Sequence, residues 1–165
     1  MIFGDVLSIA LMTQKNFGLL EYAKNHPAGK IGRRLTLRVR DLMLKDNDVP
    51  LCAPHDTLVN TLVELSNKKC GCVMIVDKDR SLMGIFTDGD LRRALQKHGP
   101  KALEKTMQEL MTKTARCINC DDMASSALTL MEADQKRPIT VLPVVNEKSQ
   151  VVGLIKMHDI VQTGL

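Results

Sequence analysis

Residues 84–90 combine the residue types that a site for a phosphorylated sugar needs; they read Gly-Ile-Phe-Thr-Asp-Gly-Asp. The pattern predicts that a strand ends here and a helix begins, and free backbone N–H groups at a helix N-terminus attract anions such as phosphate. Thr87 adds a hydroxyl donor, and Asp90 could accept hydrogen bonds from both hydroxyls of a ribose. Alternatively, Thr87 or Asp88 only caps the helix, and Asp90 favours its dipole. Arg92 and Arg93, which follow, could reach a phosphate or remain in solvent.

A second copy of this pattern, Gly-Leu-Ile-Lys-Met-His-Asp, lies 69 residues later at 153–159. Its Asp159 has the place of Asp90, whereas Lys156 replaces the threonine. Lys156 could meet a phosphate as a point charge, or it could mark a degenerate site without a ligand. His158 lies inside the second pattern, and it could line a pocket or be exposed.

The two patterns close two copies of a longer repeat, which starts at residue 38 and has an offset between 66 and 69 residues. Each copy predicts a strand, a helix with apolar residues at helical spacing, two strands around a polar turn, and a closing helix. We expect Asp56 and Asp122 to cap the first helix of each copy. The predicted strands cover residues 49–52, 73–76 and 82–86 in the first copy and 116–118, 141–145 and 151–155 in the second. The expected fold is therefore α+β, with the order β-α-β-β-α twice.

The composition is that of a globular protein and argues against two classes of partner. The chain has 165 residues, of which 44% are hydrophobic and 25% charged, an ordinary balance. Only 2% are aromatic, and the net charge of +4 is scattered along the chain. We expect no nucleic-acid binding, because single-stranded nucleic acids need stacking platforms and massed cations. We expect no membrane partner, because no apolar run approaches the roughly 20 residues of a membrane span.

The five cysteines predict a cytoplasmic protein with reduced thiols, because their number is odd and their spacing is ordinary. Cys117 and Cys120 could be combined with Cys70 and Cys72 into a four-thiolate zinc site. The Cys-x-Cys spacing is poor for zinc, and both pairs lie on or beside predicted strands. We therefore expect small buried thiols and no metal.

Two tandem β-α-β-β-α units that each close with this glycine-to-aspartate pattern resemble a pair of cystathionine-β-synthase-type (CBS) domains. In that family the threonine or serine of the pattern contacts a ligand phosphate, and the aspartate binds ribose. The resemblance implies that Thr87 and Asp90 bind a ligand in the first copy and that Asp159 does so in the second. Lys156 departs from the family pattern, so the second site is in doubt. The resemblance also implies a pseudo-two-fold pair with two clefts between its units and a homodimer.

A narrower resemblance covers the whole chain. Residues 3–5 (Phe-Gly-Asp), 26–35 (His-Pro-Ala-Gly-Lys-Ile-Gly-Arg-Arg-Leu), 84–93 and 157–159 (Met-His-Asp) together resemble the D-arabinose 5-phosphate isomerases. In that family a sugar isomerase (SIS) domain precedes a CBS pair. The apolar segment at residues 1–22, which we expect to be helical, then belongs to the SIS domain.

The resemblance implies three parts of the chain: 1–35, a C-terminal remnant of the SIS domain with its linker; 36–104, the first CBS domain; and 105–165, the second. His26 matches the catalytic histidine of the family, which suits acid–base isomerisation. Most of the SIS domain, including its other catalytic residues, is missing from the sequence. His26 could therefore act only in the context of a complete SIS domain.

We favour regulatory ligand binding as the function of this chain. The resemblance implies a nucleotide-type effector, either an adenosine phosphate or a cytidine nucleotide such as CMP-Kdo, with no cofactor required. The pathway would then be the supply of Kdo for lipopolysaccharide. Two alternatives stay open: an aldose–ketose isomerase that converts D-ribulose 5-phosphate to D-arabinose 5-phosphate, and a structural assembly module whose clefts hold no ligand.

Overall fold

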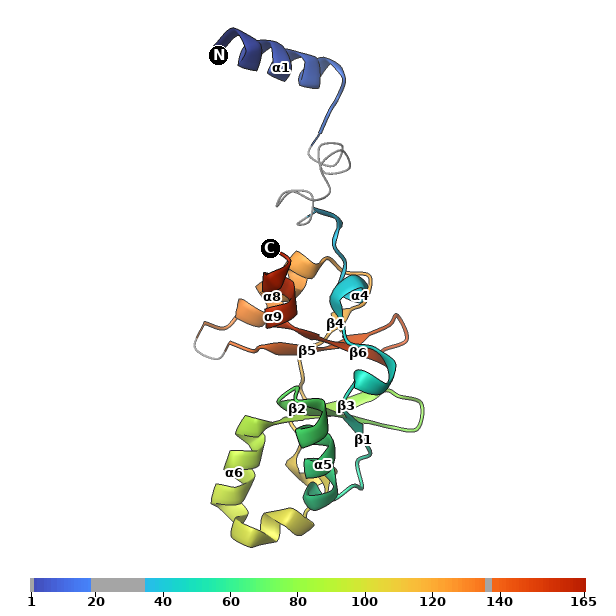
Figure 1. Ribbon diagram of the computed structural model, residues 1–165. Helices are drawn as coiled ribbons and strands as arrows, with labels where there is room; N and C mark the ends of the chain where they lie inside the picture. The colour runs from blue at the N-terminus through green and yellow to red at the C-terminus, as the bar shows by residue number, and fades with distance from the viewer. Residues whose placement is uncertain (1, 19–34, 136–137) are drawn as a thin grey trace.

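The computed structural model describes residues 2–18, 35–135 and 138–165. His26 lies outside these residues, as does the loop at 25–35 apart from its last residue. Within them the chain forms an N-terminal helix and two units of the same topology, as the repeat predicts (Figure 1). The N-terminal helix is α1 (Ile2–Gln14).

Each unit is a three-stranded sheet with helices on one face. The first strand of each sheet runs parallel to the middle one, and the third runs antiparallel to it. The first unit contains β1 (Leu51–Cys52), α5 (Leu58–Lys68), β2 (Cys72–Val76), β3 (Leu82–Thr87) and α6 (Asp88–His98). The second contains β4 (Ile118–Asn119), α8 (Ala124–Glu132), β5 (Val141–Val145), β6 (Val151–Lys156) and α9 (Met157–Gln162). Two 3-10 helices, η1 (Asp46–Asp48) and η2 (Gly99–Glu104), lie in the connections of the first unit.

The prediction that Asp56 and Asp122 cap α5 and α8 is wrong. Each helix begins two residues later, and neither carboxylate reaches its first turn. Asp56 Oδ2 instead accepts a hydrogen bond from the backbone N–H of Ala53 at 2.7 Å, and Asp122 Oδ2 accepts one from Asn119 at 3.2 Å. Both aspartates therefore close the turn after the first strand of their unit, because a short polar side chain bonds to nearby backbone.

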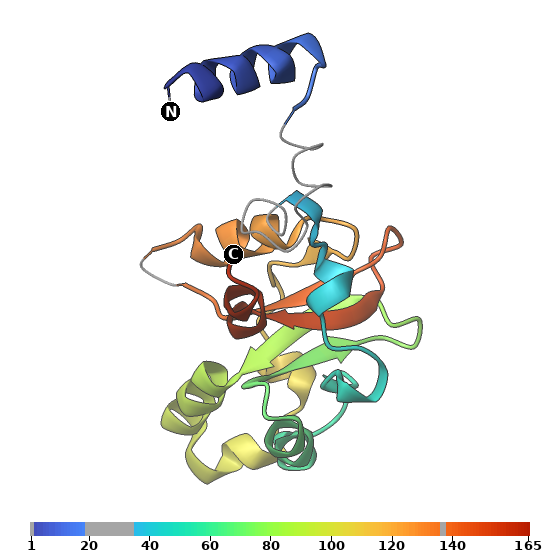
Figure 2. The same ribbon diagram turned by 45° about the horizontal axis from the view of Figure 1, so that its top comes forward.

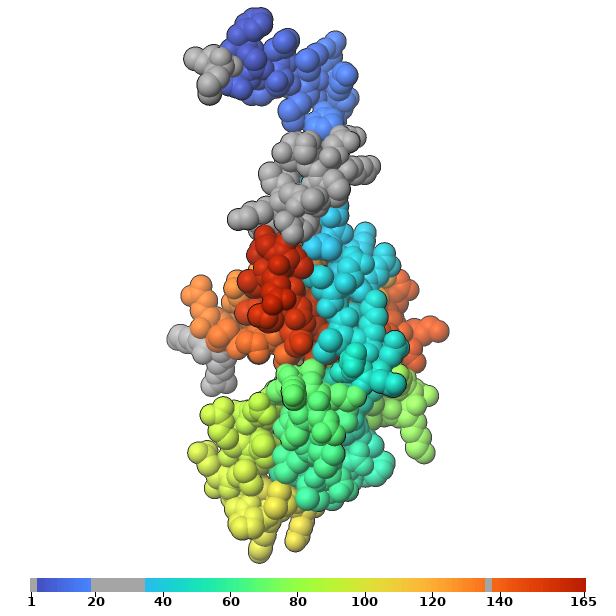
Figure 3. Space-filling model, in the orientation of Figure 1, coloured from blue at the N-terminus to red at the C-terminus, as the bar shows by residue number. Residues whose placement is uncertain are grey.

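The two sheets face each other across a common apolar layer, and the helices lie outside (Figures 1 and 2). In the space-filling view the units are in contact across the middle of the molecule (Figure 3). Seven residues from both units form the buried part of this layer: Val49, Cys70, Cys72, Met74, Val145, Val151 and Leu154. At one edge the two hairpin turns pair, with a bridge between Ser81 and Gln150. Since these two residues hold equivalent places in the repeat, the pair has pseudo-two-fold symmetry.

The segment in front of each unit crosses over and packs on the other unit. Helix α4 (Val39–Leu42) buries Val39 in the core of the second unit, and α7 (Met107–Leu110) buries Met107 in the core of the first. The crossing backbones pair with the third strands: Ile85 with Thr112, and Leu154 with Leu44. The two units are therefore interlocked rather than simply in contact.

Gly84 and Gly153 make this crossing possible. A Cβ atom at Gly84 would lie 2.8 Å from the backbone oxygen of Thr112, and one at Gly153 would lie 2.6 Å from that of Leu44. Backbone atoms at such distances cannot move aside as the end of a flexible side chain can. The glycine that opens each sequence pattern is thus required by the close approach of the crossing segment.

Gly84→Ala and Gly153→Ala should each destabilise the pair of units by about 1–3 kcal/mol, because the added methyl forces the crossing backbone away from the strand. Urea denaturation measures the free energy of unfolding. Gly4→Ala in α1 is the matched control, since its new Cβ meets nothing within 4 Å. Unfolding of Gly153→Ala at the same urea concentration as the parent would contradict the argument.

Helix α1 lies apart from the two units (Figure 1) and confirms the predicted N-terminal helix, although it ends at Gln14 rather than continuing through the expected segment 1–22. It exposes apolar side chains, led by Phe3 at 81% and Ile9 at 64% of their surface. No helix in the described part of the chain has the length and apolar character needed to cross a membrane.

Candidate functional site

A cleft of about 680 Å³ lies between the two units where β3 leads into α6. One wall comes from the first unit and the other from the second. The first wall includes Gly71, Thr87, Asp88, Gly89, Asp90 and Arg93, together with Thr112 of the crossing segment, and the second includes Arg116, Asp134 and residues 138–141. We call this space the α6 cleft. It brings Thr87 and Asp90 together, as the sequence pattern predicts.

Asp90 is the buried centre of this cleft, with 10% of its side chain exposed. Its Oδ2 accepts hydrogen bonds from the backbone N–H of Thr87 at 2.9 Å and from the Thr87 hydroxyl at 2.6 Å. Its Oδ1 accepts one from the Arg93 guanidinium and one from the Thr112 hydroxyl at 3.3 Å. Four donors therefore surround one carboxylate, which explains how a charged group is tolerated at this depth.

Thr87 is the N-cap of α6, which decides between the two residues that could cap this helix. Its hydroxyl oxygen accepts a bond from the backbone N–H of Asp90 at 3.3 Å while Asp90 reaches back to it, which makes a capping box. The backbone N–H of Asp88 donates to the carbonyl of Gly71 at 3.2 Å. Two of the first three N–H groups of α6 are thus already bonded within the protein.

Sequence reasoning missed Thr112 and left Arg93 undecided between phosphate and solvent. The position of Thr112 depends on the crossing segment, which places it beside Ile85 and hence beside Asp90. Nothing in the local sequence indicates that crossing. Arg93 reaches Asp90 because the two residues are three positions apart on one helix, a spacing that could have indicated the pair.

The second sequence pattern forms a different environment. Lys156 and Asp159 make an ion pair at 3.5 Å, and both are partly exposed. His158 is exposed, and its Nε2 lies 2.7 Å from Nε2 of Gln162. A smaller cleft of about 440 Å³ is lined by Cys70, Thr140, Val141, Lys156, Met157, His158 and Val161. Asp159 is not part of that lining.

The repeat shows why the two sites differ. The places of Thr87, Arg93 and Thr112 are taken in the second copy by Lys156, Gln162 and Leu44. Of these two clefts in the described part of the chain, it is the α6 cleft whose carboxylate is held on both oxygens by side chains, one of them from the crossing segment.

Two of the cysteines have the properties of structural thiols. Burial raises the pKa of Cys52 and of Cys72 to about 12, so neither is a thiolate near neutral pH. All five cysteines are free of disulfides. Cys117 differs from the expectation of buried thiols because it is exposed. Among the described residues, no cluster of three or more histidine, cysteine, aspartate or glutamate side chains could hold a metal ion.

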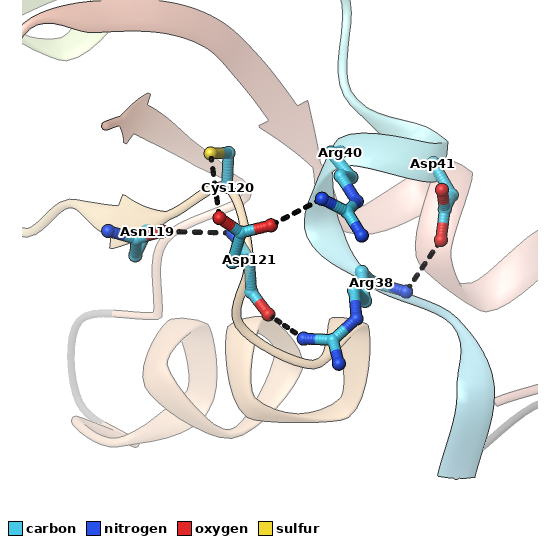
Figure 4. Close-up of polar contacts among 6 residues, drawn as sticks. All are labelled: Arg38, Arg40, Asp41, Asn119, Cys120 and Asp121. Carbon is cyan, nitrogen blue, oxygen red and sulfur yellow. Dashed lines mark hydrogen bonds and ion pairs between the residues drawn. The ribbon is translucent and has the colours of Figure 1, made fainter. Parts of the chain in front are cut away.

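A second polar cluster holds the start of the first crossing segment on the second unit (Figure 4). Arg40 Nη1 donates to Asp121 Oδ1 at 2.6 Å, and Arg38 donates to the backbone carbonyl of Asp121. The N–H of Asp121 donates to Asn119 Oδ1 at 2.9 Å. Because Arg40 and Asp121 are both half exposed, this ion pair adds little to stability. The cluster orients the segment rather than forming a site.

The ionisation of Asp90 should make the free energy of unfolding depend on pH. Burial raises its pKa, but hydrogen bonds from Thr87 and Arg93 outweigh burial, and the net pKa lies below the ordinary value. A carboxylate with a depressed pKa stabilises the fold above its unfolded pKa of about 3.9, and this contribution is lost as the pH falls through the folded pKa.

We expect Asp90→Asn to lower the free energy of unfolding at pH 7 and the difference from the parent to shrink as the pH falls below 4. Denaturant titrations between pH 7 and pH 3 measure it. A difference that stays constant over this range would show that the charge of Asp90 does not stabilise the fold.

Comparison with known proteins finds a family model and several relatives that match this chain. The model of the CBS domain family matches residues 39–97 and 107–164. An uncharacterized protein of Chlamydia pneumoniae is 42% identical over all of this chain and 50% of its own length. The arabinose 5-phosphate isomerase KdsD of Francisella tularensis is 37% identical over all of this chain and 49% of its own length. The chain thus spans about half the length of these curated relatives.

Solved structures share the fold of the pair. CBSX2 of Arabidopsis thaliana, in complex with AMP, has a TM-score of 0.66 and 24% identity over 78% of this chain and 96% of its own. The CBS domain pair of protein MJ0100, in complex with 5-methylthioadenosine and S-adenosyl-L-methionine, has a TM-score of 0.64 and 25% identity over 76% of this chain and 93% of its own.

Proposed function

Because the chain belongs to the CBS domain family, we propose that it is a regulatory, nucleotide-binding CBS pair of an arabinose 5-phosphate isomerase. The effector binds in the α6 cleft. The observation that carries this proposal is the buried carboxylate of Asp90 in a cleft whose walls come from both units. Relatives that cover this chain completely are named arabinose 5-phosphate isomerases.

In this proposal Asp90 accepts the hydroxyls of a ribose, and Thr87 lies beside the phosphate. A ligand in the α6 cleft contacts both units, so it favours the arrangement of the units that fits it best. Such a preference is the only way in which an effector can act on a distant site. The effector is an adenosine phosphate or a cytidine nucleotide of the CMP-Kdo type, and the AMP complex of CBSX2 makes AMP the first probe.

The second cleft is less suited to a nucleotide than the α6 cleft. Lys156 and His158 line it, but the ammonium of Lys156 is already paired with Asp159, which does not line it. Its lining also lacks the aspartate that would accept a ribose. We therefore assign one nucleotide to each chain, in the α6 cleft.

The test is calorimetric titration of the chain with AMP, ATP and CMP-Kdo, supported by thermal unfolding. A nucleotide at a hundred times its Kd should stabilise the fold by about 2.7 kcal/mol, which raises Tm by several degrees. Asp90→Asn should weaken binding by at least about tenfold, because it removes the charge that the ribose hydroxyls meet. Asp159→Asn, the equivalent change in the second unit, should leave binding unchanged.

Two results would contradict the assignment. Loss of binding in Asp159→Asn with full binding in Asp90→Asn would move the site to the second cleft. Failure of all three nucleotides to bind the folded parent chain would favour a structural assembly module instead.

The activity of the whole protein is part of the same proposal. His26 would act as the acid–base residue of a complete SIS domain, which the first 35 residues continue, ahead of CBS domains at 36–104 and 105–165. The isomerase would work in the cytoplasm and supply arabinose 5-phosphate for lipopolysaccharide. The absence of disulfides among the five cysteines supports this location.

We also propose that the CBS pair forms a homodimer through the outer face of α5. This face consists of Val59, Asn60, Val63, Ser66 and Asn67, all exposed and none charged. Val59 and Val63 expose 50% and 62% of their surface. Depletion of charge together with exposed apolar side chains is typical of the core of an interface, and a second copy supplies a matching uncharged face.

Val63→Glu should convert the homodimer to a monomer, because two like charges would be buried at the centre of the symmetric contact. Light scattering coupled to gel filtration measures the mass. Glu147→Gln, a change at the far hairpin, should remain dimeric. A monomeric parent chain, or a Val63→Glu chain with the mass of a dimer, would exclude this face.

A further inference from the structure

We propose that Arg93 selects phosphorylated ligands in the α6 cleft: it is the counter-ion of Asp90 in this structure and becomes the phosphate ligand when a ribose takes its place on Asp90. This inference rests on the proposed function and goes beyond it, because it assigns the residue that distinguishes a nucleotide from a nucleoside.

The acceptor sites of Asp90 are the first step of the argument. A carboxylate offers about four acceptor sites, two on each oxygen. All are used here, two by Thr87 and one each by Arg93 and Thr112. A ribose hydroxyl can therefore bond to Asp90 only if one of these donors leaves.

Arg93 is the donor that can leave. Thr87 is fixed by the capping box of α6, and two backbone hydrogen bonds with Ile85, at 2.8 Å and 3.0 Å, fix the backbone of Thr112, so its short side chain stays beside Asp90. The side chain of Arg93, by contrast, is long and 69% exposed. Rotation about its side-chain bonds releases Asp90 without disturbing the helix or the crossing segment.

The released guanidinium stays within the cleft. Arg93 lines the α6 cleft, and its Nη1 atom lies 3.4 Å from the place where a Cβ of Gly89 would stand. The guanidinium thus lies over the first turn of α6, where the glycine leaves room for it. A guanidinium binds phosphate oxygens through two parallel hydrogen bonds. When the ligand carries a phosphate, that phosphate replaces Asp90 as the anionic partner of Arg93.

The exchange makes binding depend on the phosphate. AMP breaks the Arg93–Asp90 ion pair and supplies a new anion for Arg93. Adenosine breaks the same ion pair and supplies none. In the second unit the place of Arg93 is taken by Gln162, which is neutral and cannot make the same exchange.

Calorimetric titration with AMP and with adenosine tests the inference on the parent chain, Arg93→Gln and Arg92→Gln. The parent should bind AMP at least about tenfold more tightly than adenosine. In Arg93→Gln the affinity for AMP should fall and that for adenosine should rise, so the ratio approaches one. Arg92→Gln is the matched control, since Arg92 is not in the lining of the cleft, and it should keep the parent ratio. Arg93→Lys should restore part of the preference, because it keeps the charge without the planar fork.

The outcomes separate this inference from the proposed function. An Arg93→Gln chain that binds AMP and adenosine in the parent ratio would overturn the role of Arg93 and leave the nucleotide site standing. An equal loss of affinity for both ligands would assign Arg93 to maintenance of the cleft and also overturn it. Failure of the folded parent to bind either ligand would overturn the proposed function itself.

Discussion

The close approach of backbone at Gly84 and Gly153 is the constraint on which the rest of this structure depends. At each glycine a crossing segment lies against the third strand of the other unit, at distances that leave no room for a Cβ atom. The crossing buries Val39 and Met107 in the opposite units and joins the two cores. Because the units are interlocked, the clefts between them have walls whose relative position is defined, and a ligand in a cleft contacts both.

The same crossing produces the chemistry of the α6 cleft. It delivers Thr112 to Asp90, so the carboxylate is held by the crossing segment as well as by residues of its own helix and cap. Asp90 therefore has two tasks, as part of the cap of α6 and as the anionic centre of the cleft. The cap interpretation and the ligand interpretation of the sequence pattern are compatible, since the capping box fixes Oδ2 while Arg93 on Oδ1 is exposed enough to be exchanged.

The two copies of the repeat have the same backbone arrangement but form two different sites. The turns after β1 and β4, the paired hairpins and the two crossings recur at equivalent positions. The side chains around the second aspartate do not recur: Lys156, Gln162 and Leu44 replace the three residues that hold Asp90. The topology of each unit depends on apolar spacing and on one glycine, whereas its ligand chemistry depends on a few polar side chains. The topology can therefore stay the same in both units while the ligand chemistry differs.

The sequence by itself determined the α+β class, the two β-α-β-β-α units, the central strands and the position of Thr87 and Asp90 at the start of a helix. These follow from local periodicity and from the types of neighbouring residues, which the repeat displays twice. The sequence-based prediction of the caps of α5 and α8 was wrong. Asp56 and Asp122 are residues of a type that often caps a helix, and only the turn geometry shows that each closes a turn instead. The crossing and the place of Thr112 were decided by the tertiary structure alone, because they depend on contacts between segments distant in sequence. The spacing of Asp90 and Arg93 could indicate their pairing, and Lys156 in place of the threonine could indicate that the two clefts differ. Only the tertiary structure shows the side-chain geometry that each cleft presents.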